Sequence, residues 1–297
     1  MRINERIKTK PVDLLQAYRV ANSAADMASN LDEKIKAYDA VINFCFSSQD
    51  CLMDDSTKRN MVMYWTYNNI GDALVSKNAK DSGFPFDSAN YTAALKYYEA
   101  SFQVARDDAE KMNALQRMAD TYKKMGNNAK WLAAKEQIIE YMDDSYKRRA
   151  YAELAEKIDD GEIYASLYEK ALNYVMKEEV SVLAKCQNSL EFCDKLKAVY
   201  RAAGDKENLK RLSELSDKTA FVAINALAER VDNEYDRNKR LALFAQILEL
   251  EEKYLGKDAE YRLHIYRQLE KMLEEGDVLN VNGTKYSKDK IHQMLKN

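Results

Sequence analysis

Glycine and proline are scarce in this sequence, which has eight glycines and two prolines among its 297 residues. Proteins on average contain about 7% glycine and about 5% proline. Because these residues interrupt helices and initiate turns more often than others, their scarcity favours helix throughout the chain. The only substantial irregular segment that we expect in the first half covers residues 78–88, around Phe84-Pro85-Phe86.

Residues suited to catalysis or metal binding are also few. His264 and His292 are the only histidines, and no glycine-rich phosphate-binding loop occurs. A histidine-based triad or a metal site is therefore not indicated, and we predict that the chain is not an enzyme and uses no cofactor. The four cysteines follow neither a disulfide framework nor a metal-binding spacing, and we expect small buried hydrophobic residues at Cys45, Cys51, Cys186 and Cys193.

The sequence lacks long hydrophobic runs and an excess of either charge. No run of about 18 apolar residues is present to span a membrane, and the basic N-terminal segment Met1–Ile7 is not followed by the apolar core of a signal peptide. Lysine and arginine total 46 against 49 aspartates and glutamates, for a net charge of −3. Binding to nucleic acid would require a clear basic excess. We therefore expect a cytoplasmic protein with no membrane or nucleic-acid partner.

What the sequence does contain is a recurring helical pattern. Residues 167–172 read Leu-Tyr-Glu-Lys-Ala-Leu, and related segments occur at 97–102 and 243–248. Each segment places an aromatic residue three positions before a small or branched apolar residue, which puts both on one face of a helix. Recurrence of one such unit is typical of repeat proteins, in which helical hairpins stack on one another.

Short joints divide the chain into helix pairs. Gly126-Asn127-Asn128, Asp159-Asp160-Gly161 and Gly204-Asp205 combine residues that end a helix with residues that cap the next one. We therefore predict an all-α, up-and-down array with joints of about two to six residues. The expected helices cover residues 11–29, 32–42, 55–77, 88–106, 108–125, 129–142, 146–158, 162–176, 178–203, 205–216, 217–232, 236–255 and 258–275.

The last twenty or so residues follow a different period. Val278–Val281 and Thr284–Tyr286 flank Asn282-Gly283, the strongest short signal for a β-hairpin. Ser287 then precedes a final helix over 288–296. We interpret this tail as a cap on the last repeat and the whole chain as a single domain, with a divergent helix pair at 1–54, repeats at 55–275 and the hairpin with its capping helix at 276–297.

The second helix pair resembles the tetratricopeptide repeat. Its first helix carries Trp65, Ile70, Gly71 and Leu74, and its second carries Ala94, Tyr98 and Ser101; residues 248–258 are similar to the kinesin light chain variety of the repeat. The resemblance covers roughly residues 55–275, although the second pair has an insertion, no proline follows the second helices and the first pair matches poorly. It implies a right-handed superhelical solenoid of antiparallel helix pairs, with a concave groove lined by the first helix of each pair.

The resemblance also implies a set of groove residues. The position after the small residue of each first helix gives Asp72, Asp120, Glu153 and Glu229, and the position three residues before it gives Asn68, Gln116, Arg149 and Asn225. Side-chain amides can hold an extended peptide backbone, because each carries both a donor and an acceptor. The acids would favour a basic ligand. The alternative is that these are ordinary solvated faces of a highly charged helical chain.

Three functional interpretations follow from the sequence. The first is a protein-interaction module that binds a peptide or protein segment in the groove. The second is a self-assembling scaffold that stacks through its terminal repeats, and the third is an all-helical enzyme, which would require a deep pocket enclosing acidic residues. The Phe84–Phe86 loop is either packed or a contact site. The identity of the partner, the pathway and the oligomeric state are not encoded in any residue pattern.

Overall fold

The computed structural model describes residues 13–47, 56–80, 88–177, 180–255 and 260–296. These residues belong to two compact units, Met1–Asp143 and Asp144–Asn297, and each unit is described by itself. The predictions made for Pro11, Cys51 and the Phe84–Phe86 loop concern positions outside the described residues. No helix in the part of the chain that the structure describes is both long and apolar enough to cross a membrane.

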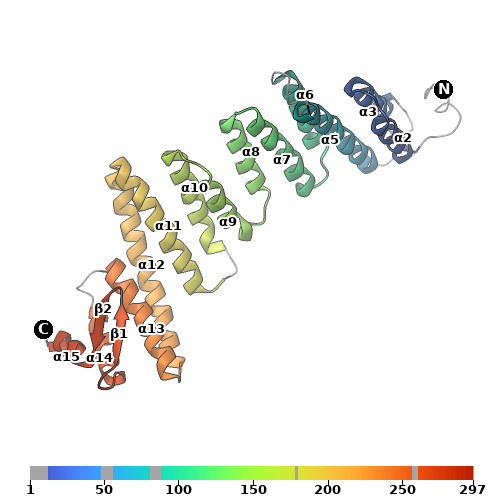
Figure 1. The fold of residues 1–297 in the computed structure, drawn as a ribbon. Coiled ribbons are helices and arrows are strands. Elements are labelled where there is room, and N and C mark those ends of the chain that lie inside the picture. Colours follow the sequence, from blue (N-terminus) through green and yellow to red (C-terminus); the bar gives the residue numbers. More distant parts are fainter. Residues whose placement is uncertain (1–12, 48–55, 81–87, 178–179, 256–259, 297) are drawn as a thin grey trace. The chain divides into compact units, whose positions relative to one another are not determined.

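The first unit consists of helices that pack in chain order (Figure 1). Helix α2 packs on α3, α3 on α5, α5 on α6, α6 on α7 and α7 on α8. The helices are α2 (Leu14–Asp26), α3 (Leu31–Ser47), α5 (Ser56–Lys80), α6 (Ser88–Val104), α7 (Asp108–Lys124) and α8 (Asn128–Glu140).

The second unit continues the helical pattern and ends in a small sheet (Figure 1). Its elements are α9 (Asp144–Ala155), α10 (Gly161–Tyr174), the 3₁₀ turn η1 (Val175–Lys177), α11 (Val182–Ala203), α12 (Lys206–Asn233), α13 (Arg237–Leu250), the π-helical turn η2 (Glu251–Leu255), α14 (Glu260–Met272), β1 (Val278–Val281), β2 (Thr284–Ser287) and α15 (Lys288–Lys296). The predicted all-α fold of antiparallel helix pairs, with a C-terminal hairpin and a final helix, is confirmed.

The helix joints form as their residue types predict. Gly204 adopts a left-handed conformation, with φ of 73°, and ends α11, while the Asp205 side chain accepts a hydrogen bond from the Asn208 amide and begins α12. Asn127 and Asp160 cap α8 and α10 in the same way. Such caps supply partners for backbone amides that the first turn leaves unbonded, and each contributes about 1 kcal/mol.

One predicted helix boundary is wrong. Separate helices were expected at 205–216 and 217–232, whereas α12 runs without a break from Lys206 to Asn233. At the expected boundary Ser216 is buried, and its hydroxyl donates to the carbonyl of Leu212, one turn earlier, at 2.8 Å. The hydroxyl is bonded inside the helix, and the backbone stays helical through this residue, so no new helix begins here. Because α12 packs against both α11 and α13, it serves in two neighbouring helix pairs.

The C-terminal hairpin forms in the predicted register, with Val281 opposite Thr284 and left-handed conformations at Asn282 and Gly283. Val281 and Tyr286 of the hairpin and Ile291 of α15 are buried against a hydrophobic core that includes Leu269. The tail therefore covers apolar surface of α14, which is the role expected of a cap at the end of a repeat array.

Helices α5 and α6 approach closely at Gly71. A Cβ atom at this position would lie 2.4 Å from Cε1 of Tyr98, whose ring is buried. Only glycine leaves room for the tyrosine ring at this crossing of α5 and α6.

We expect Gly71→Ala to lower the free energy of unfolding by about 1–3 kcal/mol, because the added methyl group overpacks a core that has no space for it. Gly161→Ala is the matched control, since a Cβ at this helical position would meet no atom closer than 3.8 Å. Urea denaturation of both variants measures the difference. Equal effects of the two substitutions would contradict the close-approach interpretation.

The π-helical turn that follows α13 carries a buried carboxylate. Glu251 is fully buried, and its Oε2 accepts a long hydrogen bond of 3.4 Å from Nε of Arg262 in α14. Its other oxygen, Oε1, has no hydrogen-bond partner among the described residues. Burial raises the pKa of the Glu251 carboxyl above its ordinary value of 4.5, and Arg262 offsets part of that rise. The adjacent Glu252 accepts a hydrogen bond from Tyr286, so this turn also holds the hairpin.

A carboxyl whose pKa is raised by folding stabilises the fold most at low pH, and this contribution is lost as the pH rises through the folded-state pKa. We therefore expect the native protein to gain stability relative to Glu251→Gln as the pH is lowered from neutral toward 4.5, the ordinary pKa of glutamate. The stability meant is the free energy of unfolding. Urea denaturation across this range tests the sign. The exposed Glu249→Gln is the control, and parallel pH profiles of Glu251→Gln and the native protein would refute the expectation.

Candidate functional site

The predicted groove residues are divided between the two units. Asn68 and Asp72 lie on α5, and Gln116 and Asp120 on α7, all in the first unit. The second unit carries the remaining positions, with Arg149 and Glu153 on α9 and Asn225 and Glu229 on α12.

Asn68 is part of the helix packing. It is buried, its Nδ2 donates to the carbonyl of Tyr64 at 3.0 Å and its Oδ1 accepts from the hydroxyl of Ser101 at 3.1 Å. These bonds satisfy a polar side chain between α5 and α6, where an unpaired amide would be costly. Asn68 therefore offers no free amide group to a ligand.

Gln116 and Asp120 form a surface network on α7. Nε2 of Gln116 donates to Oδ1 of Asp120 at 2.7 Å, and its Oε1 accepts from Nζ of Lys135 on α8 at 2.7 Å. Asp120 is exposed and Gln116 is partly buried. The amide side chain is thus held in one orientation, with the aspartate beside it open to solvent.

The four positions of the second unit are mostly exposed. Nε of Arg149 lies 2.6 Å from Oε1 of Glu153, one turn further along α9, and both side chains are more than half exposed, at 77% and 56%. Glu229 is exposed and Asn225 is partly buried, and they lie four residues apart on one face of α12. An exposed pair of this kind contributes little to stability and is free to rearrange around a ligand.

Asp72 joins three helices. Its Oδ1 accepts a 2.8 Å hydrogen bond from the hydroxyl of Tyr98 on α6, and Nε of Arg117 on α7 lies 3.2 Å from the same oxygen. Burial, followed by the charge of Asp72, raises the pKa of Tyr98, so its hydroxyl keeps the proton that it donates. We call this arrangement of Tyr98, Asp72 and Arg117 the first clasp.

An equivalent arrangement occurs in the second unit. Tyr168 on α10 donates to Glu156, just beyond α9, and Nζ of Lys195 on α11 lies 2.8 Å from both the glutamate Oε1 and the tyrosine oxygen. We call Tyr168, Glu156 and Lys195 the second clasp. In both clasps a core tyrosine of one pair fixes an acid, and a cation from the following helix completes the arrangement. The repeat pattern identified Tyr98 and the recurring segment 167–172 that contains Tyr168, but it did not identify the charged partners.

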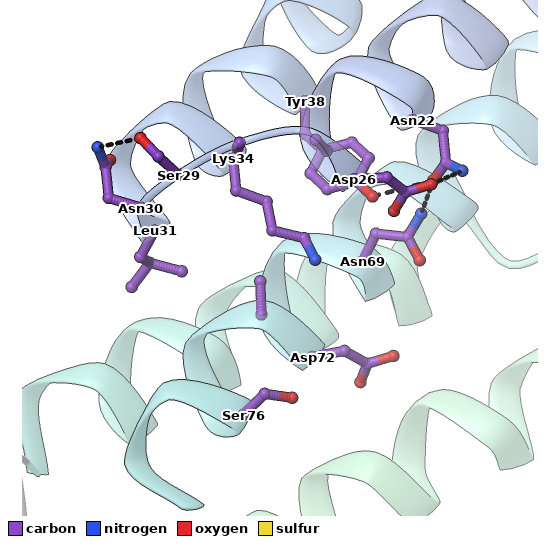
Figure 2. A pocket seen from close by; sticks show the side chains of 13 residues that line it. Asn22, Asp26, Ser29, Asn30, Leu31, Lys34, Tyr38, Asn69, Asp72 and Ser76 are labelled. Atoms are coloured by element: carbon purple, nitrogen blue, oxygen red, sulfur yellow. Dashed lines mark hydrogen bonds between the residues drawn. The ribbon is translucent and has the colours of Figure 1, made fainter. Parts of the chain in front are cut away.

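A pocket of about 580 Å³ opens in the first unit between α2, the α2–α3 joint, α3 and α5 (Figure 2). Asp26 from α2 and Asp72 from α5 line it, together with Lys34 from α3. The volume lies within the range of about 300–1,000 Å³ that is usual for ligand sites. Asp72 is the only predicted groove residue among the residues that line the pocket.

Hydrogen bonds fix the polar wall of this pocket (Figure 2). The Tyr38 hydroxyl donates to Oδ1 of Asn22 at 3.0 Å, and Nδ2 of Asn69 donates to the Tyr18 hydroxyl at 2.9 Å and more weakly to Asn22. Burial, with smaller contributions from Tyr18 and Asp26, raises the pKa of Tyr38 to about 12. The pocket was missed from the sequence because the first helix pair matches the repeat pattern poorly, and the recurrence of Asn and Tyr at helical spacing was the only available signal.

The described ranges contain no group of three or more histidine, cysteine, aspartate or glutamate side chains placed to hold a metal ion. The three cysteines that the structure describes, Cys45, Cys186 and Cys193, are buried thiols, as expected.

Comparison with known proteins gives structural neighbours only. No protein-family model and no curated protein matches the sequence. The chain is similar to the crystal structure of a Podosopora anserina putative kinesin light chain with nearly identical TPR-like repeats, at 13% identity and a TM-score of 0.33, over 71% of this chain and 96% of that one. A variant of that protein gives 13% identity and a TM-score of 0.32, over 74% and 96%.

We expect Tyr98→Phe to lower the free energy of unfolding by about 1 kcal/mol, because the substitution removes the hydroxyl that Asp72 binds and leaves the ring in place. A double-mutant cycle with Asp72→Ala should show coupling of similar size. Tyr235→Phe is the control, since this side chain is 97% exposed. If Tyr98→Phe changes the free energy of unfolding in urea as little as the control does, the first clasp does not stabilise the fold.

Proposed function

We propose that this chain is a protein-interaction module that binds a peptide or an extended protein segment along the exposed faces of its first helices. The observation that supports this most directly is the position of two of the predicted acids. Nε of Arg117 on α7 lies 3.2 Å from Oδ1 of Asp72 on α5, and Asp120 follows Arg117 by one helical turn, so the two acids lie near one another on adjacent first helices. Neighbouring acids on successive repeats form a surface complementary to a basic segment.

The amide and arginine side chains extend this surface. Gln116 is held beside Asp120 in the first unit. The second unit carries polar positions of its own, Arg149 with Glu153 on α9 and Asn225 with Glu229 on α12. Amide groups bind peptide backbone without regard to side chains, and acids add a preference for lysine and arginine. The proposal makes no use of Asn68, which is buried.

The alternative of a scaffold that stacks through its C-terminal end has less support. At the C-terminal end Val281, Tyr286 and Ile291 already bury the apolar surface of α14. Stacking through this end would require an exposed apolar face, as in contacts between successive repeats. We therefore favour a module that binds its partner laterally, along the helix faces.

Selection of a random peptide library on the intact protein tests the proposal. We expect enrichment of peptides that contain lysine or arginine. Simultaneous reversal of three exposed acids, Asp120→Lys, Glu153→Lys and Glu229→Lys, should weaken their binding tenfold or more in fluorescence polarisation, because charge complementarity is lost. Asp72 is left unchanged in this variant because it also belongs to the first clasp.

The matched control reverses three other exposed acids, Glu99→Lys, Glu249→Lys and Glu275→Lys, which lie on α6, on α13 and after α14. This variant undergoes the same change in net charge and should bind the selected peptides nearly as well as the native protein. Failure to enrich any peptide, or equal loss of binding in the two triple variants, would refute the proposed function.

A further inference from the structure

The turn of the C-terminal hairpin combines two residues whose reactivity the fold does not use. Asn282 and Gly283 form the two-residue turn between β1 and β2. Among the described residues Asn282 is the only one other than glycine with a positive φ, at 48°. Such a turn requires left-handed backbone at both positions, which asparagine and glycine adopt most readily. Both residues are exposed, so the turn explains their type and leaves the Asn282 amide open to chemistry.

The two groups that react in an Asn-Gly pair are both accessible here. The side chain of Asn282 and the backbone amide of Gly283 have no hydrogen-bond partner among the described residues. The carboxamide carbon of asparagine is an electrophile, and the following backbone nitrogen is placed to close a five-membered ring on it. Glycine has no Cβ atom that would shield this nitrogen. Asn282-Gly283 is the only Asn-Gly pair in the sequence.

We propose that Asn282 is a site of spontaneous deamidation and that its isoaspartate product releases the C-terminal cap, which consists of β1, β2 and α15. The Gly283 nitrogen attacks Cγ of Asn282 and forms a C–N bond. The bond from Cγ to Nδ2 breaks, and ammonia leaves with the proton that the Gly283 amide gives up. Water then opens the succinimide ring. Cleavage at Cγ gives aspartate, whereas cleavage at the backbone carbonyl carbon gives isoaspartate.

The closed turn slows the first step. Its left-handed backbone turns the Gly283 nitrogen away from the Asn282 side chain, so ring closure requires the hairpin to open. The sheet has two strands of four residues each, and a hairpin of this size is marginally stable by itself. The rate of deamidation therefore depends on the contacts that hold the hairpin against the helices.

These contacts are few. Val281 and Tyr286 of the hairpin and Ile291 of α15 are buried against the core that includes Leu269. The Tyr286 hydroxyl also donates a hydrogen bond to Glu252. Each contact raises the free energy of opening, and so lowers the fraction of molecules in which the turn can react.

Isoaspartate changes the turn itself. The chain then continues through the side chain of residue 282, which adds one methylene group to the backbone between Val281 and Gly283. The two-residue turn that places Val281 opposite Thr284 is lost, and with it the register that directs Val281 and Tyr286 together into the core. The C-terminal cap then detaches and uncovers apolar surface of α14. The aspartate product leaves the backbone unchanged, and Asp-Gly favours the same turn.

Ageing of the intact protein tests the site. The protein is kept in mildly alkaline buffer at body temperature, and peptide mapping by mass spectrometry follows Asn282 and, as an internal control, Asn233. The control is also exposed, but its Nδ2 donates to the carbonyl of Glu229 at 2.7 Å, and the amide of Glu234 donates to the carbonyl of Val231. We expect Asn282 to convert at least about tenfold faster than Asn233, because the hairpin opens more readily than α12.

One substitution tests the dependence on opening. Tyr286→Phe removes the hydrogen bond to Glu252 and should raise the rate of conversion of Asn282 about fivefold, because one hydrogen bond fewer holds the hairpin closed. Tyr235→Phe, at a side chain that is 97% exposed, is the matched control and should leave the rate unchanged. Equal rates in the two variants would contradict a reaction that proceeds through the open hairpin.

Hydrogen–deuterium exchange tests the consequence. Protein in which isoaspartate has accumulated should exchange faster in β1, β2 and α15 than fresh protein, with unchanged exchange in α9 and α10. Fresh Asn282→Asp should exchange like the native protein, because it adds the same charge without lengthening the backbone. The inference is overturned if Asn282 converts no faster than Asn233, or if the C-terminal cap keeps its protection after isoaspartate has formed. The peptide selection described above is independent of both outcomes.

Discussion

The ring of Tyr98, packed on the bare backbone of Gly71, is the contact on which the proposed binding surface depends. A tyrosine in this place fills the gap between α5 and α6 and carries its hydroxyl to Asp72 at the edge of the core. The acid, held there, then binds Arg117 of the next helix pair. The packing of Tyr98 in one helix pair thus positions its hydrogen bond to Asp72, and Asp72 in turn forms an ion pair with Arg117 of the next helix pair.

These contacts explain why Asp72, which was expected only to bind ligand, also has a structural role. Asp72 lines the pocket and completes the first clasp, so its charge is already shared with Arg117. The second clasp repeats the arrangement of tyrosine, acid and cation around Tyr168, in a unit of different sequence. Repeat proteins gain stability from interfaces between neighbouring pairs, and a buried tyrosine that fixes a surface acid contributes both to such an interface and to the binding face.

The sequence was sufficient to predict features that depend on neighbouring residues. The cap at Asp205 and the turn at Asn282-Gly283 follow from backbone conformations that only a few residue types favour. It was insufficient where the outcome depends on contacts distant in the chain. Asn68 is buried because Ser101, from the following helix, supplies a partner. Ser216 is a local exception, since its hydroxyl bonds to Leu212 within its own helix, which continues without a break. The clasps and the pocket combine residues from three helices, and no spacing rule relates them.

Hydrogen–deuterium exchange of the native protein and of Asp72→Ala tests most directly whether this acid links successive helix pairs. If the first clasp joins three helices, its loss allows them to open together. The predicted result is faster exchange in α5, α6 and α7, with unchanged exchange in α9, α10 and α11. Faster exchange confined to the turn of α5 that contains residue 72 would contradict the account, because it would show that the acid stabilises only its own helix.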